Sequence, residues 1–364
     1  MAISAIDAIP LAVQHTRQQL FQPFRVGQWT KLAVVGMLAG ELGSGSGFNG
    51  NFPGHSGSAP HSLGSVFKGI DPIMLASLIA IVVVAAFTLG LILMYIGSVM
   101  RFVLFDSVMA KECRVRQGWG RRQGEGWRYF LWKLLYLVGM FAGIFVLIVI
   151  PAAFALAVGW FKEPKEHLLP LILGGIILFF VVLAFVVAMS VIFVLTKDFV
   201  VPQMALENIG AFEAWGRLWR MMKAEPGAYA AYLGMKIVMA IGAGIIVGIA
   251  TLILGLIVAI PTIGLSIIAV LTGKTAGLTW NVYSITLAVV VGSILFAIFL
   301  YLIALISVPV IVFFPAYSIY FFAARYPALS AALYPPAANA LPVPQGAVPP
   351  YEPPPLPPFP QTAG

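Results

Sequence analysis

The side chains able to support acid–base, nucleophilic or metal chemistry are few and scattered. The 364 residues include 13 Asp+Glu, four His and one Cys. A metal site needs three or four ligands at fixed spacing, whereas His55 and His61 fall in a Gly/Ser-rich stretch and His167 lies far from both. Basic neighbours favour the thiolate of Cys113, but no histidine is near it in sequence, so we expect an ordinary reduced thiol. We therefore expect no cofactor, no metal and no enzymatic activity.

Basic residues form the most distinctive polar feature of the chain. The segment Lys111–Lys133 interleaves arginines with tryptophans, a composition that suits binding to an anionic membrane surface. The alternative is that these residues only set the topology, with Asp106, Glu112 and Glu125 as ion-pair partners. The candidate contacts for anionic headgroups are Arg114, Arg116, Arg121, Arg122, Arg128, Arg217 and Arg220.

The composition shows which solvent surrounds the chain. Hydrophobic residues make up 61% and charged residues 9%, with a mean hydropathy of +0.99, whereas soluble domains carry about 25% charged residues. This excludes a soluble enzyme, a free nucleic-acid binder and a disulfide-stapled secreted domain. The formal charge of +8 then points to membrane headgroups, because the basic residues sit beside apolar runs.

Long apolar runs predict an all-α, polytopic membrane protein, because a spanning helix needs about 20 such residues. Five runs meet that length: 73–100, 130–160, 168–196, 229–260 and 282–314. A sixth segment, 29–42, is shorter and contains Lys31 and Glu41, so it is either a marginal span or a re-entrant hairpin. We expect Pro151 and Pro261 to kink or end their helices, and 262–273 to form a separate external piece.

The distribution of basic residues predicts the sidedness. If 29–42 crosses, seventeen Lys and Arg lie on the side of both termini and four lie on the other side. The positive-inside rule makes the richer side cytoplasmic. We thus expect about six spans in three hairpins in the cytoplasmic membrane, with Glu41 at the outer end of the short one. No Asp, Glu, Arg or His lies in the middle of the five long runs, which argues against an ion-coupled transporter.

The chain divides into three parts. Residues 1–28 form an amphipathic interfacial segment, 29–334 form the membrane domain with a flexible Gly/Ser-rich external loop at 43–68, and 335–364 form a proline-rich disordered cytoplasmic tail. The tail is either an extended arm that recruits a partner through polyproline II recognition or a segment without a role.

Two features indicate an internal repeat and helix packing. Trp119-Gly120-Arg121 and Trp215-Gly216-Arg217 are 96 residues apart, and Pro23-Phe24-Arg25 lies a further 96 residues back. We expect a repeated unit of an amphipathic helix followed by a hairpin, most clearly in 203–223, whose apolar face contacts either lipid or the helix bundle. Gly139 and Gly143 have the spacing of close helix–helix contacts.

Several short motifs resemble known membrane proteins. Leu20-Phe21-Gln22-Pro23-Phe24-Arg25 followed by Trp29-Thr30-Lys31-Leu32-Ala33 resembles the opening of a family of uncharacterised prokaryotic multi-span proteins. The stretch Val201–Glu207 is similar to a pattern in that family and in the membrane domain of some glycerophosphoryl diester phosphodiesterases. Those phosphodiesterases keep their catalytic residues in a separate soluble barrel, for which this sequence has no stretch long enough.

We therefore expect a non-enzymatic scaffold or accessory factor of the cytoplasmic membrane. Its partners would be membrane lipids and a cytoplasmic protein bound by the tail, without nucleic acid. The alternative is a transporter, exporter or channel for an apolar or lipid-like substrate.

Overall fold

The computed structural model describes residues 3–41, 71–160, 165–275 and 282–335, and within these ranges it contains helices and no strands. The all-α prediction is confirmed for this part of the chain. The loop at 43–68, with His55 and His61, and residues 336–364 of the tail lie outside the described residues.

Five described helices are long and apolar enough to cross a membrane, and each covers all or nearly all of one of the long apolar runs. The protein is thus a multi-pass membrane protein. These helices are α5 (Pro72–Met109), α6 (Val115–Ala157), α7 (Leu168–Leu195), α10 (Pro226–Thr275) and α11 (Val282–Ala323). Asp71 begins α5 by accepting a hydrogen bond from the Ile73 amide at 3.0 Å, with proline at the first helical position.

The helices extend beyond the apolar runs that predicted them. Helix α5 continues nine residues past Met100, and α6 begins fifteen residues before Phe130. Residues 262–273 continue α10 through Pro261, so the prediction of a separate external piece is wrong. Pro151 also lies inside its helix. A proline removes one main-chain hydrogen bond, and the turns on either side carry a long membrane helix past that gap.

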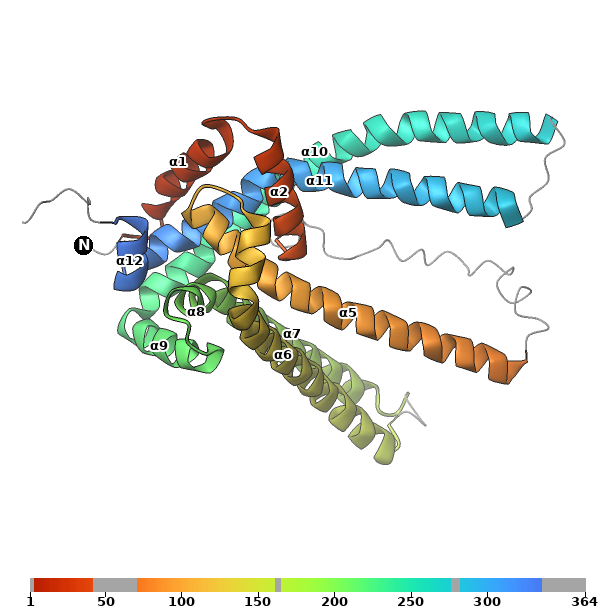
Figure 1. Cartoon of the computed structure of the whole chain (residues 1–364). Coiled ribbons are helices and arrows are strands. Elements are labelled where there is room, and N and C mark those ends of the chain that lie inside the picture. The colour runs from red at the N-terminus through yellow and green to blue at the C-terminus, as the bar shows by residue number, and fades with distance from the viewer. Residues whose placement is uncertain (1–2, 42–70, 161–164, 276–281, 336–364) are drawn as a thin grey trace, which may run out of the picture.

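The molecule has a compact end and three extended parts (Figure 1). We call the compact end the cap; it contains the short helices and the adjoining ends of the long ones. The three limbs are α5 alone, α6 with α7, and α10 with α11. The most apolar 18-residue window is 0% buried in α5, α6 and α7, and at most 11% buried in the other two helices. Apolar faces this extensive require lipid or another protein as their environment.

The short helices complete the cap. They are α1 (Ala8–Phe21), α2 (Val26–Leu38), η1 (a π-helix, Thr196–Val200), α8 (Val201–Glu207), α9 (Ala211–Ala224) and α12 (Pro327–Leu333). The predicted interfacial segment 1–28 thus contains α1, which buries Ala8, Ala12 and Leu20 and packs against α11. Helix α2 has 13 residues, or about 20 Å, which is shorter than the roughly 30 Å of hydrocarbon.

The predicted amphipathic helix 203–223 is interrupted at Asn208. This residue adopts a left-handed conformation (φ 53°) that ends α8, and α9 starts after it. On α9, Ala214 and Leu218 are fully buried, whereas Phe212 and Trp219 are 69% and 53% exposed. The apolar face therefore divides, with one part packed on the cap and the other facing outward.

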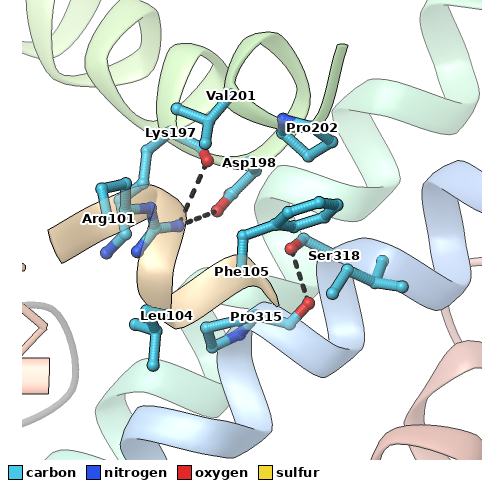
Figure 2. Close-up of a pocket in the computed structure, with 10 residues that line it drawn as sticks. Arg101, Leu104, Phe105, Lys197, Asp198, Val201, Pro202, Pro315 and Ser318 are labelled. Atoms are coloured by element: carbon cyan, nitrogen blue, oxygen red, sulfur yellow. Dashed lines mark hydrogen bonds and ion pairs between the residues drawn. The ribbon is translucent and has the colours of Figure 1, made fainter. Parts of the chain in front are cut away.

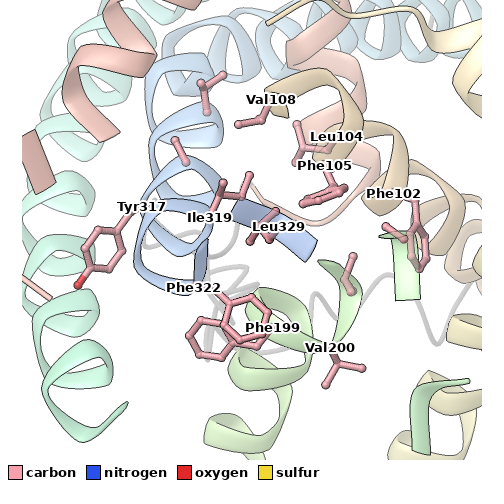
Figure 3. Close-up of a cluster of buried hydrophobic side chains, with 14 of the residues drawn as sticks. Phe102, Leu104, Phe105, Val108, Phe199, Val200, Tyr317, Ile319, Phe322 and Leu329 are labelled. Carbon is pink, nitrogen blue, oxygen red and sulfur yellow. The ribbon is translucent and has the colours of Figure 1, made fainter. Parts of the chain in front are cut away.

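Aromatic rings fill the centre of the cap (Figure 3). Phe199 of η1 lies 5.0 Å from Phe322 of α11 and 4.9 Å from Tyr232 of α10, measured between ring centroids. All three side chains are fully buried. Burying rings of this size stabilises the cap through both apolar area and ring–ring contacts.

Candidate functional site

Five charged residues are buried together where the limbs enter the cap. Arg101 lies on α5, Lys197 and Asp198 on η1, Lys236 on α10, and Glu41 three residues after the end of α2. Their side chains are between 1% and 9% exposed. Ionisable groups at such depth in a membrane protein are costly and default candidates for function, so we name this set the buried charge cluster.

The cluster is held together by direct ion pairs and hydrogen bonds. The Glu41 carboxylate pairs with both Arg101 and Lys197. Arg101 also donates to the Lys197 carbonyl at 3.1 Å, and its Nη2 lies 3.9 Å from Asp198 Oδ1 (Figure 2). Asp198 Oδ2 accepts from Lys236 and, at 2.9 Å, from the Tyr232 hydroxyl. Each carboxylate is therefore shared between two cations.

Lys197 and Asp198 lie on a segment that protein surrounds on all sides. Every residue of η1 is buried, and Lys197 and Asp198 are 7% and 1% exposed. Both charged neighbours are therefore buried, although neighbouring residues on a helix point about 100° apart. Single π turns of this kind occur frequently at functional sites.

A cavity of about 10 Å³ adjoins the cluster, lined in part by Arg101, Asp198, Pro202 and Ser318. Figure 2 shows these side chains around it, with Ser318 turned to the Pro315 carbonyl at 2.9 Å. This volume holds about one water molecule. Three cations face two carboxylates, so the cluster carries one excess positive charge.

The arrangement is that of a clamp. It joins the end of α2 to α5, η1 and α10, and removing either carboxylate would leave cations buried without compensation. Within the described ranges there is no group of three or more His, Cys, Asp or Glu residues able to hold a metal ion.

Sequence reasoning missed this cluster because four of its members lie at the edges of the apolar runs, and only Lys236 lies inside one, 229–260. Arg101 directly follows Met100, and Lys197 directly follows Thr196, so both were counted as cytoplasmic flanks. The available signal was spacing: Arg101 and Lys197 are 96 residues apart, as are the two Trp-Gly-Arg motifs. Glu41 was predicted at the outer end of a span. It instead contacts Arg101 and Lys197 near the basic ends of the long helices, so that prediction is wrong.

The predicted headgroup arginines fall into two groups. Four contact protein groups: Arg114 with Glu112, Arg122 with Asp106 and Glu125, Arg128 with Asn208, and Arg217 with Glu207 and Glu213. The other three, Arg116, Arg121 and Arg220, are exposed and have no hydrogen-bond or ion-pair partner among the residues that the structure describes. All seven lie in the cap or the adjoining part of α6.

The single cysteine is inaccessible. Cys113 is 7% exposed, and burial raises the pKa of its thiol, with a smaller opposing effect from the Ser107 hydrogen bond and from Lys31. Its basic sequence neighbours therefore do not activate it. His167 precedes α7, and its ring lies 6.5 Å from that of Trp160.

A buried histidine in α1 also escaped sequence reasoning. His15 Nε2 lies 2.9 Å from the Val108 carbonyl, and Nδ1 lies 3.1 Å from the Tyr320 hydroxyl. Because a carbonyl only accepts, Nε2 carries the proton and Nδ1 accepts from Tyr320. His15 thus connects α1 to both α5 and α11. Burial, with a smaller contribution from Lys111, lowers the pKa of His15.

Together, the exposed apolar limbs and the internally paired cap define a polytopic helical membrane protein. Residues 3–332 match the family described as "Family of unknown function (DUF7544)", and the chain belongs to this family. Neither the curated proteins nor the solved structures include a match. The predicted uncharacterised family is therefore confirmed, while its relation to phosphodiesterase membrane domains stays a prediction.

Proposed function

We propose that this protein is a non-enzymatic scaffold or accessory factor of the cytoplasmic membrane, with both termini in the cytosol. The observation that carries this is the separation between a densely packed cap and limbs that face outward along most of their length. Such a body anchors in lipid by its limbs and presents the cap and the tail to partners. No catalytic role is assigned to the buried charge cluster, whose charged groups contact one another.

The contacts of the two chain ends support placing them on one side. Arg325 donates to the Ile3 carbonyl at 3.0 Å, and His15 contacts Tyr320. Five long helices between the cap and the far tips of the limbs make an odd number of passages (Figure 1). Both termini on one side require an even number of passages, which the sixth span predicted at 29–42 would supply; that span stays a prediction.

Cysteine labelling tests the orientation. In a Cys113→Ser background, Arg116→Cys places a thiol on the cap and Glu166→Cys places one at the opposite end, before α7; both positions are exposed. In intact cells an impermeant maleimide should label Glu166→Cys, and label Arg116→Cys only after permeabilisation. The reverse pattern would contradict the proposed sidedness.

Partner recruitment by the proline-rich tail is tested by deletion. Removing residues 336–364 leaves every described helix intact. We expect this deletion to remove specific proteins from the set crosslinked to the full chain in cells, while membrane insertion is unchanged. An identical set of crosslinked proteins would end the recruitment proposal.

The resemblance to the phosphodiesterase membrane domain is proposed to reflect shared architecture alone. Its motif Val201–Glu207 forms α8, in which Gln203 and Met204 are fully buried, and Pro202 lines the cavity beside the cluster. A packing role of this kind accounts for the motif without any hydrolytic chemistry.

One observation favours the second candidate function, transport or export of an apolar substrate. An apolar groove of about 350 Å³ lies between α6 and α7, lined by Val146, Leu147, Ile150, Pro151, Ile177, Leu178 and Val181. Filling it with Val181→Trp should lower the transfer of an apolar or lipid substrate in proteoliposomes if this function holds. Val187→Trp, at an exposed α7 position, is the matched control.

A further inference from the structure

A surface hollow of about 360 Å³ lies between the start of α2 and the turn that joins α5 to α6. Its lining residues are Arg25, Gly27, Gln28, Lys31, Glu112, Cys113 and Arg114. We propose that this hollow binds the phosphate group of an anionic phospholipid. The proposal rests on the proposed membrane function and assigns Arg25, Lys31 and Arg114 to one headgroup site, which does not include Arg116 or Arg220.

Charge is the first support for a phosphate ligand. Three cations and one carboxylate line the hollow, leaving two positive charges. Arg25 and Lys31 are exposed, and within the described ranges neither side chain has a hydrogen-bond or ion-pair partner. Arg114 is paired with Glu112 at 2.9 Å, but both side chains are at least half exposed. Phosphate oxygens accept strong charge-assisted hydrogen bonds from such cations.

The backbone at the start of α2 is the second support. Amides in the first turn of a helix have no partner within the helix and favour anions. Gly27 belongs to that turn and lines the hollow, and a Cβ added there would meet nothing within 4 Å. The Gln28 side chain donates to the Lys111 carbonyl at 2.8 Å, which fixes this wall against the α5–α6 turn.

The depth of the hollow matches a lipid headgroup. The Tyr301 hydroxyl donates a hydrogen bond to the Thr30 hydroxyl at 3.0 Å. Tyr301 lies where helix α11 changes from its exposed part, which includes Ile298, to its buried part, which includes Ile303. Lys31 therefore lies at the boundary between limb and cap. Beside Arg25, Phe24 and Phe21 are more than half exposed and pack against Trp29. Exposed aromatic rings next to cations are typical of the membrane–water interface.

A second hollow of about 340 Å³ shares Glu112 and Arg114 with the first and adds Arg121 and Asp106 to its charged lining. The structure thus brings Arg114 and Arg121, of the seven predicted arginines, next to adjoining hollows. This gives room for the rest of a headgroup beside the bound phosphate.

A thiol introduced as Gly27→Cys in a Cys113→Ser background reports on occupancy, because Gly27 is exposed, lines the hollow and has no atom within 4 Å of an added Cβ. Full-length protein is inserted into nanodiscs of phosphatidylcholine, with or without phosphatidylglycerol, and alkylation of this thiol by a maleimide is followed by mass spectrometry. We expect phosphatidylglycerol to slow alkylation about tenfold, as for a site that is about 90% occupied. Inorganic phosphate added to phosphatidylcholine discs should have little effect.

Two charge-matched variants locate the site. Arg25→Gln/Lys31→Gln/Arg114→Gln should lose the protection, whereas Arg17→Gln/Arg116→Gln/Arg220→Gln removes three exposed cations elsewhere and should keep it. An unchanged alkylation rate in phosphatidylcholine verifies that each variant retains the fold around the introduced thiol.

Other outcomes overturn the proposal in distinct ways. Equal loss of protection in both variants would show a diffuse basic surface in place of a site. Protection by inorganic phosphate with none by phosphatidylglycerol would replace the lipid with a soluble ligand. Failure of the protein to enter nanodiscs would contradict the membrane function itself, and normal entry without protection would contradict only this site.

Discussion

Arg101 of α5 donates a 3.1 Å hydrogen bond to the main-chain carbonyl of Lys197, 96 residues further along the chain. The same guanidinium pairs with Glu41 and lies 3.9 Å from Asp198. One side chain thus connects the first long helix to the π turn before α8 and to the end of α2. The geometry of the limbs relative to the cap depends on this connection, and the first prediction tests it.

Glu41→Gln should lower the free energy of unfolding by about 3–5 kcal/mol, because it leaves Arg101 and Lys197 buried beside a neutral amide. The control is Glu213→Gln, whose carboxylate pairs with Arg217 at the surface and is 57% exposed. Its cost should be at most about 1 kcal/mol. Denaturant unfolding of the detergent-solubilised protein compares the two, and equal costs would show that the cluster does not clamp the fold.

Adjacent arginines in α6 should respond differently to the same substitution. Arg122 contacts Asp106 through two 2.8 Å hydrogen bonds and donates to the Ala205 carbonyl at 2.7 Å, which connects α5, α6 and α8. Arg122→Gln should destabilise by about 1.5–3 kcal/mol. Arg121 is exposed, so Arg121→Gln should change the free energy of unfolding by no more than about 0.5 kcal/mol. Thermal unfolding compares the two variants, and a larger loss of stability in Arg121→Gln than in Arg122→Gln would contradict this prediction.

Two glycines test how closely α2 approaches α5. A Cβ on Gly97 would lie 2.6 Å from the Leu38 carbonyl oxygen, whereas one on Gly120 would meet nothing within 4 Å. Gly97→Ala must move the backbone of α2 away and should cost about 1–3 kcal/mol. Gly120→Ala should stabilise by up to about 1 kcal/mol, because alanine favours a helix. Melting temperatures that shift in the same direction would contradict the close contact.

His15 makes stability depend on pH. Burial lowers its pKa in the folded protein below the ordinary 6.5, so the unfolded chain binds more protons in the window between the two values. Stability is therefore complete above about pH 6.5 and decreases as the pH falls through that window. His15→Gln should reduce this slope between pH 7 and the lowered value, as measured by denaturant unfolding across pH. An unchanged slope would assign the acid sensitivity to other groups.

The sequence predicted the helical class and the five long apolar segments because solvent preference is carried by composition. Any run of some twenty apolar residues must leave water, whatever it later packs against. Helix ends were less predictable. Residues 101–109 and 115–129 contain charged side chains; 101–109 continue α5 and are mostly buried in the cap, whereas 115–129 belong to α6 and are mostly exposed, with Gly126 and Tyr129 buried.

Two residues with a left-handed backbone conformation depend both on local sequence and on contacts with distant parts of the chain. Lys111 and Asn208 are the two non-glycine residues with positive φ in the described part of the chain, and each precedes a Trp-Gly-Arg motif by seven or eight residues. The 96-residue spacing of the motifs was visible in the sequence, but the turns at Lys111 and Asn208 that precede them were not predicted. The carbonyl and side chain of Asn208 accept hydrogen bonds from Arg128 of another helix, which local pattern does not reveal.

By itself the sequence determined that lipid surrounds most of this chain and that its basic residues gather at one end of the long helices. Only the tertiary structure decided which of those charges are buried and paired. Glu41, Arg101 and Asp198 are far apart in sequence, and their charges are tolerated only because each neutralises another at close range. Hydropathy depends on each residue's own transfer energy, whereas pairing depends on distances that exist only after the helices have packed.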